Sequence, residues 1–313
     1  MSKLDPQRLS DLENGLASFS DGILPLPGID DPSNLNSLAC QFIDSIHRVE
    51  YVRTIAGRSV SPSRADPSSN FFDPFKAAIY YRNQGKLEEA FWLVFLATHF
   101  GKHGRSGWRL LRNIYGALGD SIWAWTDVSP NPEALGDWIS VNYPELIKPG
   151  VKASFGNHRK YESIKPGSAA STGAVISSYV TWVNSHGGHL ALFQRALVES
   201  SGDPRLAFRY LYNGMLGVKR FGRTGKFDFL TMIAKLGLAN IEADSAYLSD
   251  NATGPLRGSR LLFGGAINSN LSAETLEKHL ALLANHLNVG MQEMEDALCN
   301  WQKSPAKFKR FSG

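Results

Sequence analysis

Hydrophobic residues along most of this chain recur every three or four positions, the spacing of an amphipathic helix. In residues 107–118 they fall at Trp108, Leu111, Tyr115 and Leu118. The same spacing predicts helices over residues 89–100, 107–118, 172–183, 190–199, 206–218, 227–236, 272–287 and 290–301, with Ser272 as an N-cap. No alternating pattern of strand length and no β-α-β rhythm interrupts these segments, so the sequence predicts an all-α fold.

Between the predicted helices the chain is rich in Pro, Gly, Ser, Asn and Asp, which favour turns. Such segments predict loops over residues 22–36, 57–70, 129–132 and 249–260. The loop at 57–70 is long and polar, which favours a domain boundary there. We therefore expect an N-terminal helical segment and loop over residues 1–70, followed by a helical body over residues 71–313.

The composition excludes several classes of protein. The 313 residues are 43% hydrophobic and 20% charged, unlike a disordered or collagen-like chain. The longest strongly apolar stretch, residues 90–97, is far shorter than the ~20 residues of a membrane-spanning helix, and residues 1–15 lack the apolar core of a secretory signal. Cys40 and Cys299 provide no disulfide framework. These features predict a soluble, cytoplasmic monomer without a membrane partner.

Charge is unevenly distributed along the sequence. The formal net charge is only +4. Residues 90–119 nevertheless hold four Lys or Arg and no acidic residue, and residues 204–227 hold six and again no acidic residue. Acid-free basic stretches with interleaved aromatic residues are typical of surfaces that bind nucleic-acid phosphates. The alternative interpretation is two ordinary solvent-exposed helix faces.

Motifs for metals and nucleotides are lacking in the sequence. His99 and His103 lie four residues apart, and His186 and His189 three apart, but no HExxH motif or cysteine cluster accompanies either pair. Residues 217–226 come nearest to a phosphate-binding P-loop, yet they lack its final Ser or Thr and follow a predicted helix instead of a strand. The sequence therefore predicts no metal and no other cofactor.

A basic turn at residues 219–226 joins two predicted helices and forms a candidate helical hairpin. Gly222 and Gly225 let its backbone approach a phosphate closely, and the start of the next helix points unpaired N–H groups toward it. Positive charge around the turn comes from Arg220, Arg223 and Lys226. We expect this turn to contact a DNA backbone.

Three isolated acidic residues follow the turn: Asp228, Glu242 and Asp244. A basic hairpin beside isolated carboxylates suits a protein that holds a nucleic-acid backbone and does acid–base chemistry on what is attached to it. The alternative interpretation is a basic pair of helices in which Asp228 only caps the second helix.

The hairpin, the separation of Lys226 from Asp244 and the all-helical pattern resemble the helix-hairpin-helix DNA glycosylases of the endonuclease III type. In that superfamily a Lys at the end of the hairpin and an Asp one helix later flank a flipped nucleotide, so the resemblance implies a two-lobed helical fold. The chain departs from the pattern in two places. Residues 221–225 read FGRTG instead of Pro-Gly-apolar-Gly, and Ser-Ala follows Asp244 instead of Thr-His.

Longer strings resemble clade 3 of the alpha-glutamyl/putrescinyl thymine pyrophosphorylases. They are FFDPFKAAIYYRNQGKLEEAFWLVFLATHFGKH, GWRLLRNIYG, FGNHRKYESI, RFGRTGKFDFLTMIAKLGL and YLSDNATGPLRGSRLLFGG, spread over residues 71–265. This resemblance implies action on hypermodified bases in double-stranded phage DNA. The family is also similar to a phage-defence glycosylase that excises alpha-glucosylated hydroxymethylcytosine.

Cleavage of an N-glycosidic bond builds positive charge on the deoxyribose, which a nearby carboxylate stabilises. We assign this role to Asp244, with Asp228 and Glu242 as substitutes. Lys226 is a candidate Schiff-base nucleophile or a phosphate ligand, and we favour a monofunctional enzyme without lyase activity.

A flipped base needs a pocket that stacks on it and contacts its edges. Residues 155–164 provide candidates for this pocket: Phe155, Asn157, His158, Arg159, Lys160, Tyr161 and Glu162. Further candidates for DNA binding are Lys102, His103, Arg105 and Arg109 in one glycine-rich segment, and Arg257 and Arg260 in the loop at 252–260.

Two other functions fit the same residues. One is a transferase or pyrophosphorylase that acts on pyrophosphorylated thymine during base hypermodification, and the other is a helical nucleic-acid-binding protein without chemistry. Loss of activity in a carboxylate variant that still binds DNA would favour either enzyme over the binding protein.

Overall fold

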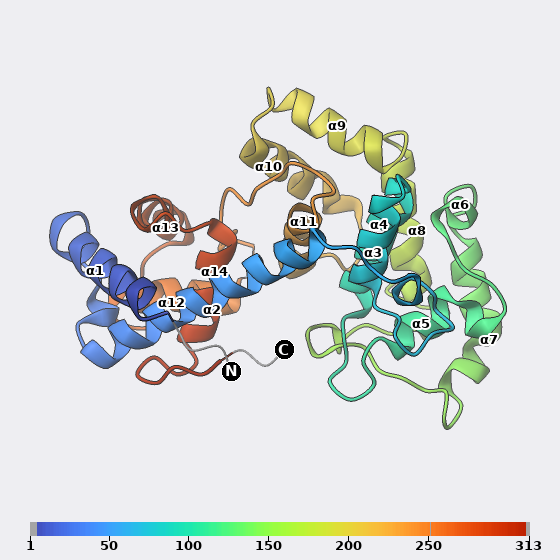
Figure 1. Ribbon diagram of the computed structural model, residues 1–313, viewed down its shortest axis with the longest axis horizontal. Coiled ribbons are helices and arrows are strands. Elements are labelled where there is room, and N and C mark those ends of the chain that lie inside the picture. The colour runs from blue at the N-terminus through green and yellow to red at the C-terminus, as the bar shows by residue number, and fades with distance from the viewer. Residues whose placement is uncertain (1–4, 251, 311–313) are drawn as a thin grey trace. The chain divides into compact units, whose positions relative to one another are not determined.

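In the computed structural model, which describes residues 5–250 and 252–310, all regular secondary structure in these ranges is helical (Figure 1). The predicted all-α fold is therefore confirmed. No helix in the described ranges is both long enough and apolar enough to cross a membrane.

The chain forms two compact units, one from its two ends and one from its middle. The first unit combines residues up to Val52 with residues from Ala243 onward, and the second spans Arg53–Glu242. This division differs from the expected one at residue 70, because the N-terminal helices pack against C-terminal helices that are distant in the sequence.

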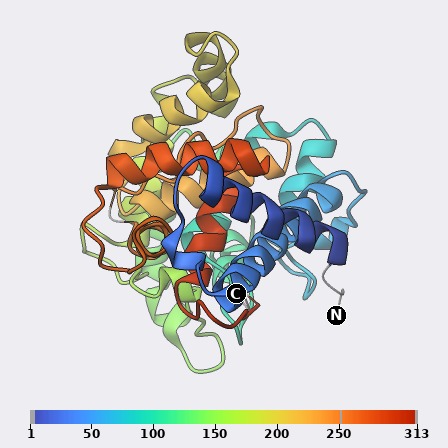
Figure 2. The ribbon, with the colours of Figure 1, turned by 90° about the vertical axis from the view of Figure 1, so that its left-hand side faces the viewer.

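In the first unit, Figure 2 shows the N-terminal helices in blue against the C-terminal helices in red. Its helices are α1 (Pro6–Gly22), most of α2 (Pro32–Ala56), α12 (Thr253–Gly264), α13 (Ala273–Leu287) and α14 (Met291–Trp301). Helices α12 and α14 meet backbone to backbone at Gly258, where an added Cβ would lie 2.8 Å from the carbonyl carbon of Leu298. Ser272 caps α13 by accepting a hydrogen bond from the Thr275 N–H (3.1 Å), as predicted.

The second unit is organised around a single buried helix. Its helices are α3 (Pro74–Asn83), α4 (Leu87–Phe100), α5 (Arg109–Tyr115), α6 (Trp125–Val128), α7 (Ala134–Ile147), α8 (Thr172–Asn184), α9 (His189–Glu199), α10 (Pro204–Gly214) and α11 (Arg223–Lys235). Every residue of α4 from Glu89 to Phe100 is buried, because α3, α5, α6, α9 and α11 pack around it. A helix that is hydrophobic on all sides is typical of such a central position.

Two acidic residues at the start of α4 connect neighbouring elements of this unit. The buried Glu89 carboxylate accepts hydrogen bonds from the Tyr115 hydroxyl and the Trp125 N–H, both at 2.6 Å, and burial raises its pKa. Glu88 accepts from the N–H groups of His189 (3.0 Å) and Leu190 (2.9 Å), so it caps α9. These contacts give both acids structural roles.

Several predicted element boundaries are wrong. The predicted loop at 249–260 contains most of α12, because Pro255 suits a first helical turn and the glycines permit its close packing. The helix predicted over 107–118 ends at Tyr115, since Ala117 and Leu118 have positive φ angles. The helix predicted over 206–218 ends at Gly214, and the loop predicted over 22–36 already contains the start of α2.

Candidate functional site

The predicted basic turn is shorter than expected, because α11 begins at Arg223 with Gly222 as its N-cap. Arg223, Gly225 and Lys226 therefore belong to the first turn of the helix. The Arg223 guanidinium lies 4.6 Å from the ring centroid of Phe227, and both Arg223 and Lys226 are buried. The Lys226 ammonium lies 3.8 Å from the centre of a tyrosine ring, at Tyr212. These two cations thus pack on aromatic rings within the unit.

Asp228 lies in the second turn of α11, so the interpretation that it caps this helix is wrong. Its carboxylate is 3.4 Å from the Arg159 guanidinium, and half of its side chain is exposed. Desolvation by the protein atoms around the carboxyl group raises the pKa of Asp228, while the positive charge of Arg159 lowers it. Asp228 is thus a solvent-accessible carboxylate that is joined to the segment predicted to form the base pocket.

Arg159 anchors that segment on the helical body. Its side chain is only 9% exposed, and its guanidinium lies 5.7 Å from the ring centroid of Phe221. A Cβ added at Gly225 would lie 3.3 Å from the Arg159 guanidinium. A Cβ added at Gly101 would lie 3.3 Å from the Cγ atom of Arg159. Both glycines therefore make room for Arg159.

Arg220 binds the same segment at a second point. It has a left-handed backbone conformation (φ +63°), and its Nε lies 3.2 Å from a Glu162 carboxylate oxygen. Its guanidinium also donates to the Tyr161 carbonyl at 3.0 Å. The Glu162 side chain is only 8% exposed, whereas the Arg220 side chain is 37% exposed, so the acid is buried and the cation stays accessible to water. Arg220, predicted as a DNA ligand, thus fixes an acidic residue of the predicted pocket.

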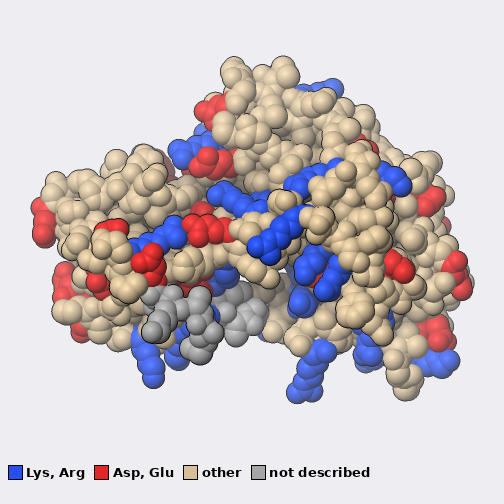
Figure 3. All heavy atoms as spheres, in the orientation of Figure 1, with Lys and Arg blue, Asp and Glu red and all other residues tan. Residues whose placement is uncertain are grey.

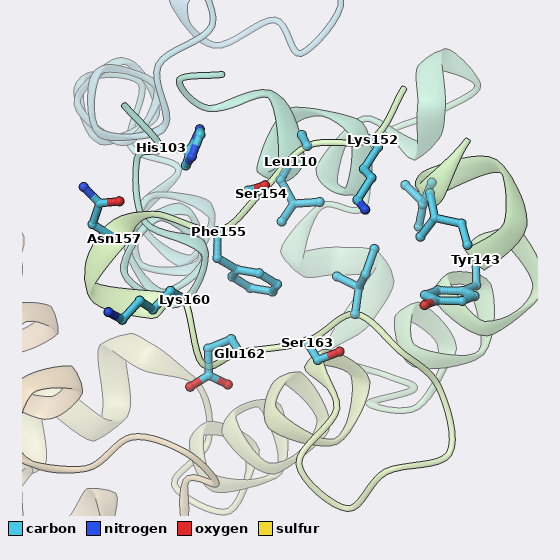
Figure 4. A pocket seen from close by; sticks show the side chains of 14 residues that line it. His103, Leu110, Tyr143, Lys152, Ser154, Phe155, Asn157, Lys160, Glu162 and Ser163 are labelled. Carbon is cyan, nitrogen blue, oxygen red and sulfur yellow. The ribbon is translucent and has the colours of Figure 1, made fainter. Parts of the chain in front are cut away.

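A cavity of about 520 Å³ lies beside this segment (Figure 4). It is lined by His103, Leu110, Tyr143, Leu146, Ile147, Lys152, Ala153, Ser154, Phe155, Asn157, Lys160, Glu162, Ser163 and Ile164. Four predicted pocket residues are among them: Phe155, Asn157, Lys160 and Glu162. The other three predicted pocket residues, His158, Arg159 and Tyr161, do not line the cavity. Arg159 is buried in the protein, and Tyr161 is 76% exposed.

Phe155 forms an aromatic surface within this cavity. Its ring stacks on Phe100, with 5.5 Å between centroids and 15° between planes, and meets His99 edge-on at 5.7 Å. In Figure 4 the ring lies in the middle of the lining residues, and the Lys152 ammonium points toward the same space. A planar ligand can stack on Phe155 there while its polar edges meet the surrounding side chains.

The glycine-rich segment predicted to bind DNA is divided between two roles. Lys102 and Arg105 are exposed, and Figure 3 shows Lys and Arg side chains gathered on the face of this unit that is turned to the viewer. His103 instead lines the cavity. Arg109 donates a hydrogen bond to the Lys152 carbonyl (2.9 Å), so it supports the cavity wall.

The other predicted site residues lie elsewhere. Glu242 forms an exposed ion pair with Arg205 (2.8 Å). Asp244 belongs to the first unit, where the Tyr247 hydroxyl donates to it at 2.6 Å. The first unit also contains the predicted DNA ligands of helix α12, Arg257 and Arg260. The proximity of Asp244 to Lys226 stays a prediction.

A buried histidine supports the cavity wall from behind. His99 Nε2 lies 3.2 Å from the Thr172 hydroxyl, which donates to the carbonyl of the lining residue Ser163 at 3.0 Å. Burial, with smaller contributions from Arg159 and Arg220, lowers the pKa of His99 to about 3. His99 is therefore neutral, and it holds Thr172 rather than a metal. No cluster of metal-ligating side chains occurs in the described part of the chain.

The cavity wall formed by α7 was not predicted from the sequence. Tyr143, Leu146 and Ile147 come from this helix, and Lys152 follows it. Buried Leu135, Ile139 and Leu146 keep a helical spacing that was available as a signal, but Pro144 inside the segment breaks the expected pattern.

The family model for clade 3 of the alpha-glutamyl/putrescinyl thymine pyrophosphorylases matches residues 33–313, so the chain belongs to this family. The name of the family indicates enzymes that act on modified bases. No curated protein and no solved structure matches the chain significantly.

Replacement of Gly156 by alanine is expected to destabilise the cavity wall. The new Cβ would lie 2.8 Å from the Gly101 carbonyl carbon and 2.9 Å from the Lys102 nitrogen, both backbone atoms that cannot rotate away. Overpacking of this kind lowers the free energy of unfolding by about 1–3 kcal/mol. Chemical denaturation measures the change, with Gly104→Ala as control because no atom lies within 4 Å of its Cβ position. Equal stability of both variants would contradict the close contact.

Proposed function

We propose that this chain is a DNA glycosylase that removes a hypermodified base from double-stranded phage DNA, as an anti-phage defence. The observation that carries the proposal is the cavity beside residues 155–164, which combines a stacking surface at Phe155 with polar groups around its rim. Extraction of a base from the duplex costs a few kcal/mol, which stacking and edge contacts in such a pocket offset. Glucosylated hydroxymethylcytosine is the first substrate to test.

Asp228 is our choice for the carboxylate that stabilises the developing positive charge on the sugar. It shares a unit with the cavity, contacts the pocket segment through Arg159 and stays half exposed. Glu242 is already paired with Arg205 on the surface. Asp244 remains the alternative, as the residue that the glycosylase pattern favours.

Lys226 is better suited to a structural role than to a lyase reaction. A Schiff-base nucleophile must reach the sugar in its neutral form. The Lys226 side chain is buried, and its ammonium lies against the Tyr212 ring, so it has little access to a sugar. This supports the monofunctional glycosylase, with Lys102 and Arg105 as exposed candidates for phosphate contact.

A second candidate function follows from the name of the family. A pyrophosphorylase or transferase would act on pyrophosphorylated thymine and leave the base attached to the DNA. Lys152, Lys160 and His103 in the cavity lining offer donors for the oxygens of a diphosphate.

The proposal is tested by incubating the protein with glucosylated phage DNA and with unmodified DNA, followed by alkali treatment. We expect alkali-labile strand breaks in the modified DNA alone. Breaks in neither DNA, with binding retained, would contradict this substrate. Breaks in both would contradict the requirement for a modified base.

A further inference from the structure

The polypeptide between His103 and Gly107 forms a small closed turn at the edge of the cavity. The His103 N–H donates to the Gly107 carbonyl (3.1 Å), and the Gly107 N–H donates to the His103 carbonyl (2.8 Å). Gly107 has a φ of +57°, which a glycine adopts without strain. The turn therefore holds the His103 side chain on a short, well-defined piece of backbone.

The same turn determines which nitrogen of the ring carries the proton. The Ser106 N–H lies 3.2 Å from His103 Nδ1, and the Ser106 hydroxyl lies 3.0 Å from the same atom. A backbone N–H can only donate, so Nδ1 is the acceptor and the neutral ring carries its proton on Nε2.

We infer that His103 is a specificity-determining residue of the cavity, which donates a hydrogen bond from Nε2 to an acceptor atom of the bound base. His103 belongs to the lining, and its Nδ1 is already occupied by Ser106. Nε2–H is therefore the polar group that the ring can offer a ligand. The nature of this ligand rests on the proposed function, whereas the tautomer and the turn do not.

The rest of the lining favours the same kind of ligand. Lys152 and Lys160 carry donors only, while the carboxylate of Glu162 is held by Arg220. The two ammonium groups and the Nε2–H of His103 have no acceptor capacity, so they suit a base edge that carries carbonyl or hydroxyl oxygens.

The first arm of the test measures the tautomer by NMR on protein labelled with ¹⁵N-histidine, with His103→Gln used to assign the ring signals. We expect the Nε2–H tautomer at neutral pH. The Nδ1–H tautomer would overturn the inference. His186→Gln serves as a control, because His186 lies outside the cavity lining and must leave the His103 signals unchanged.

The second arm uses free nucleosides, which lack phosphates: thymidine, 5-hydroxymethyl-2′-deoxyuridine and alpha-glucosylated 5-hydroxymethyl-2′-deoxycytidine. We expect at least one to shift the His103 Nε2 signal. His103→Gln should weaken its binding by less than about 3-fold, because the glutamine amide nitrogen replaces Nε2, whereas His103→Asn and His103→Phe should weaken it by about 5- to 10-fold. No shift with any nucleoside, or equal losses in the Gln and Phe variants, would overturn the inference.

The experiments distinguish failure of the proposed function from failure of the role of His103. Nucleoside binding through His103 without base release from DNA would contradict the glycosylase and retain the role of His103. Base release from DNA at an unchanged rate in His103→Phe would retain the glycosylase and overturn the role of His103.

Discussion

Asp228→Asn is expected to slow base release roughly 10²- to 10³-fold, because the amide cannot stabilise the positive charge that develops on the sugar. The substitution keeps the size of the side chain and leaves the exposed cations in place, so DNA affinity should change little. Single-turnover release of the base measures the rate, and a filter-binding assay measures the affinity.

Glu199→Gln provides the matched control, since this carboxylate is exposed at the end of α9. The pH profile gives a second readout. The pKa of Asp228 is raised, so the ionised form and the activity should be lost, as the pH falls, at a higher pH than for an ordinary aspartate. Full activity of Asp228→Asn, with loss in Asp244→Asn, would move the catalytic role to Asp244.

Acidification is expected to destabilise the fold through His99. The unfolded chain binds a proton on this ring near pH 6.5, while the folded chain does so only near pH 3. The contribution of His99 to the free energy of unfolding is therefore complete above pH 6.5. As the pH falls from 6.5 to 3, this contribution decreases by about 1.4 kcal/mol for each pH unit.

Chemical denaturation between pH 7 and pH 4 measures this slope in the wild type and in His99→Gln. Glutamine does not titrate and keeps an amide nitrogen near Thr172, so the difference between the two proteins isolates the histidine. We expect the wild type to lose stability more steeply. Parallel curves would show that His99 takes up a proton as readily in the folded chain as in the unfolded one.

The all-α class and most helices of the second unit are predictable from the sequence, because their hydrophobic residues face one common core. Helix α12 is not. Gly254 and Gly258 are typical of a loop when read locally, yet they allow α12 to pack against Cys299 and Leu298 of α14. Glycine normally destabilises a helix, but here it is required, because a larger residue would clash with a segment that is distant in the sequence.

The cavity, too, could be predicted from the sequence only in part. Residues 155–164 contain six of its lining residues, and their mixture of aromatic, amide and charged groups is visible in the sequence. The sequence does not show which arginines remain available to DNA. Arg159, Arg220 and Arg223 have the same local composition as an exposed phosphate site, but each is taken up by a carboxylate or an aromatic ring of the protein itself.

We propose above all that this chain cleaves the bond between a hypermodified base and its sugar. The most direct measurement is mass spectrometry of both fractions after incubation with glucosylated phage DNA: the small molecules released and the nucleosides of the digested DNA. We expect the intact glucosylated base in the first fraction and an equal number of abasic sites in the second. An absence of free base, with every base still attached to its sugar, would contradict this proposal.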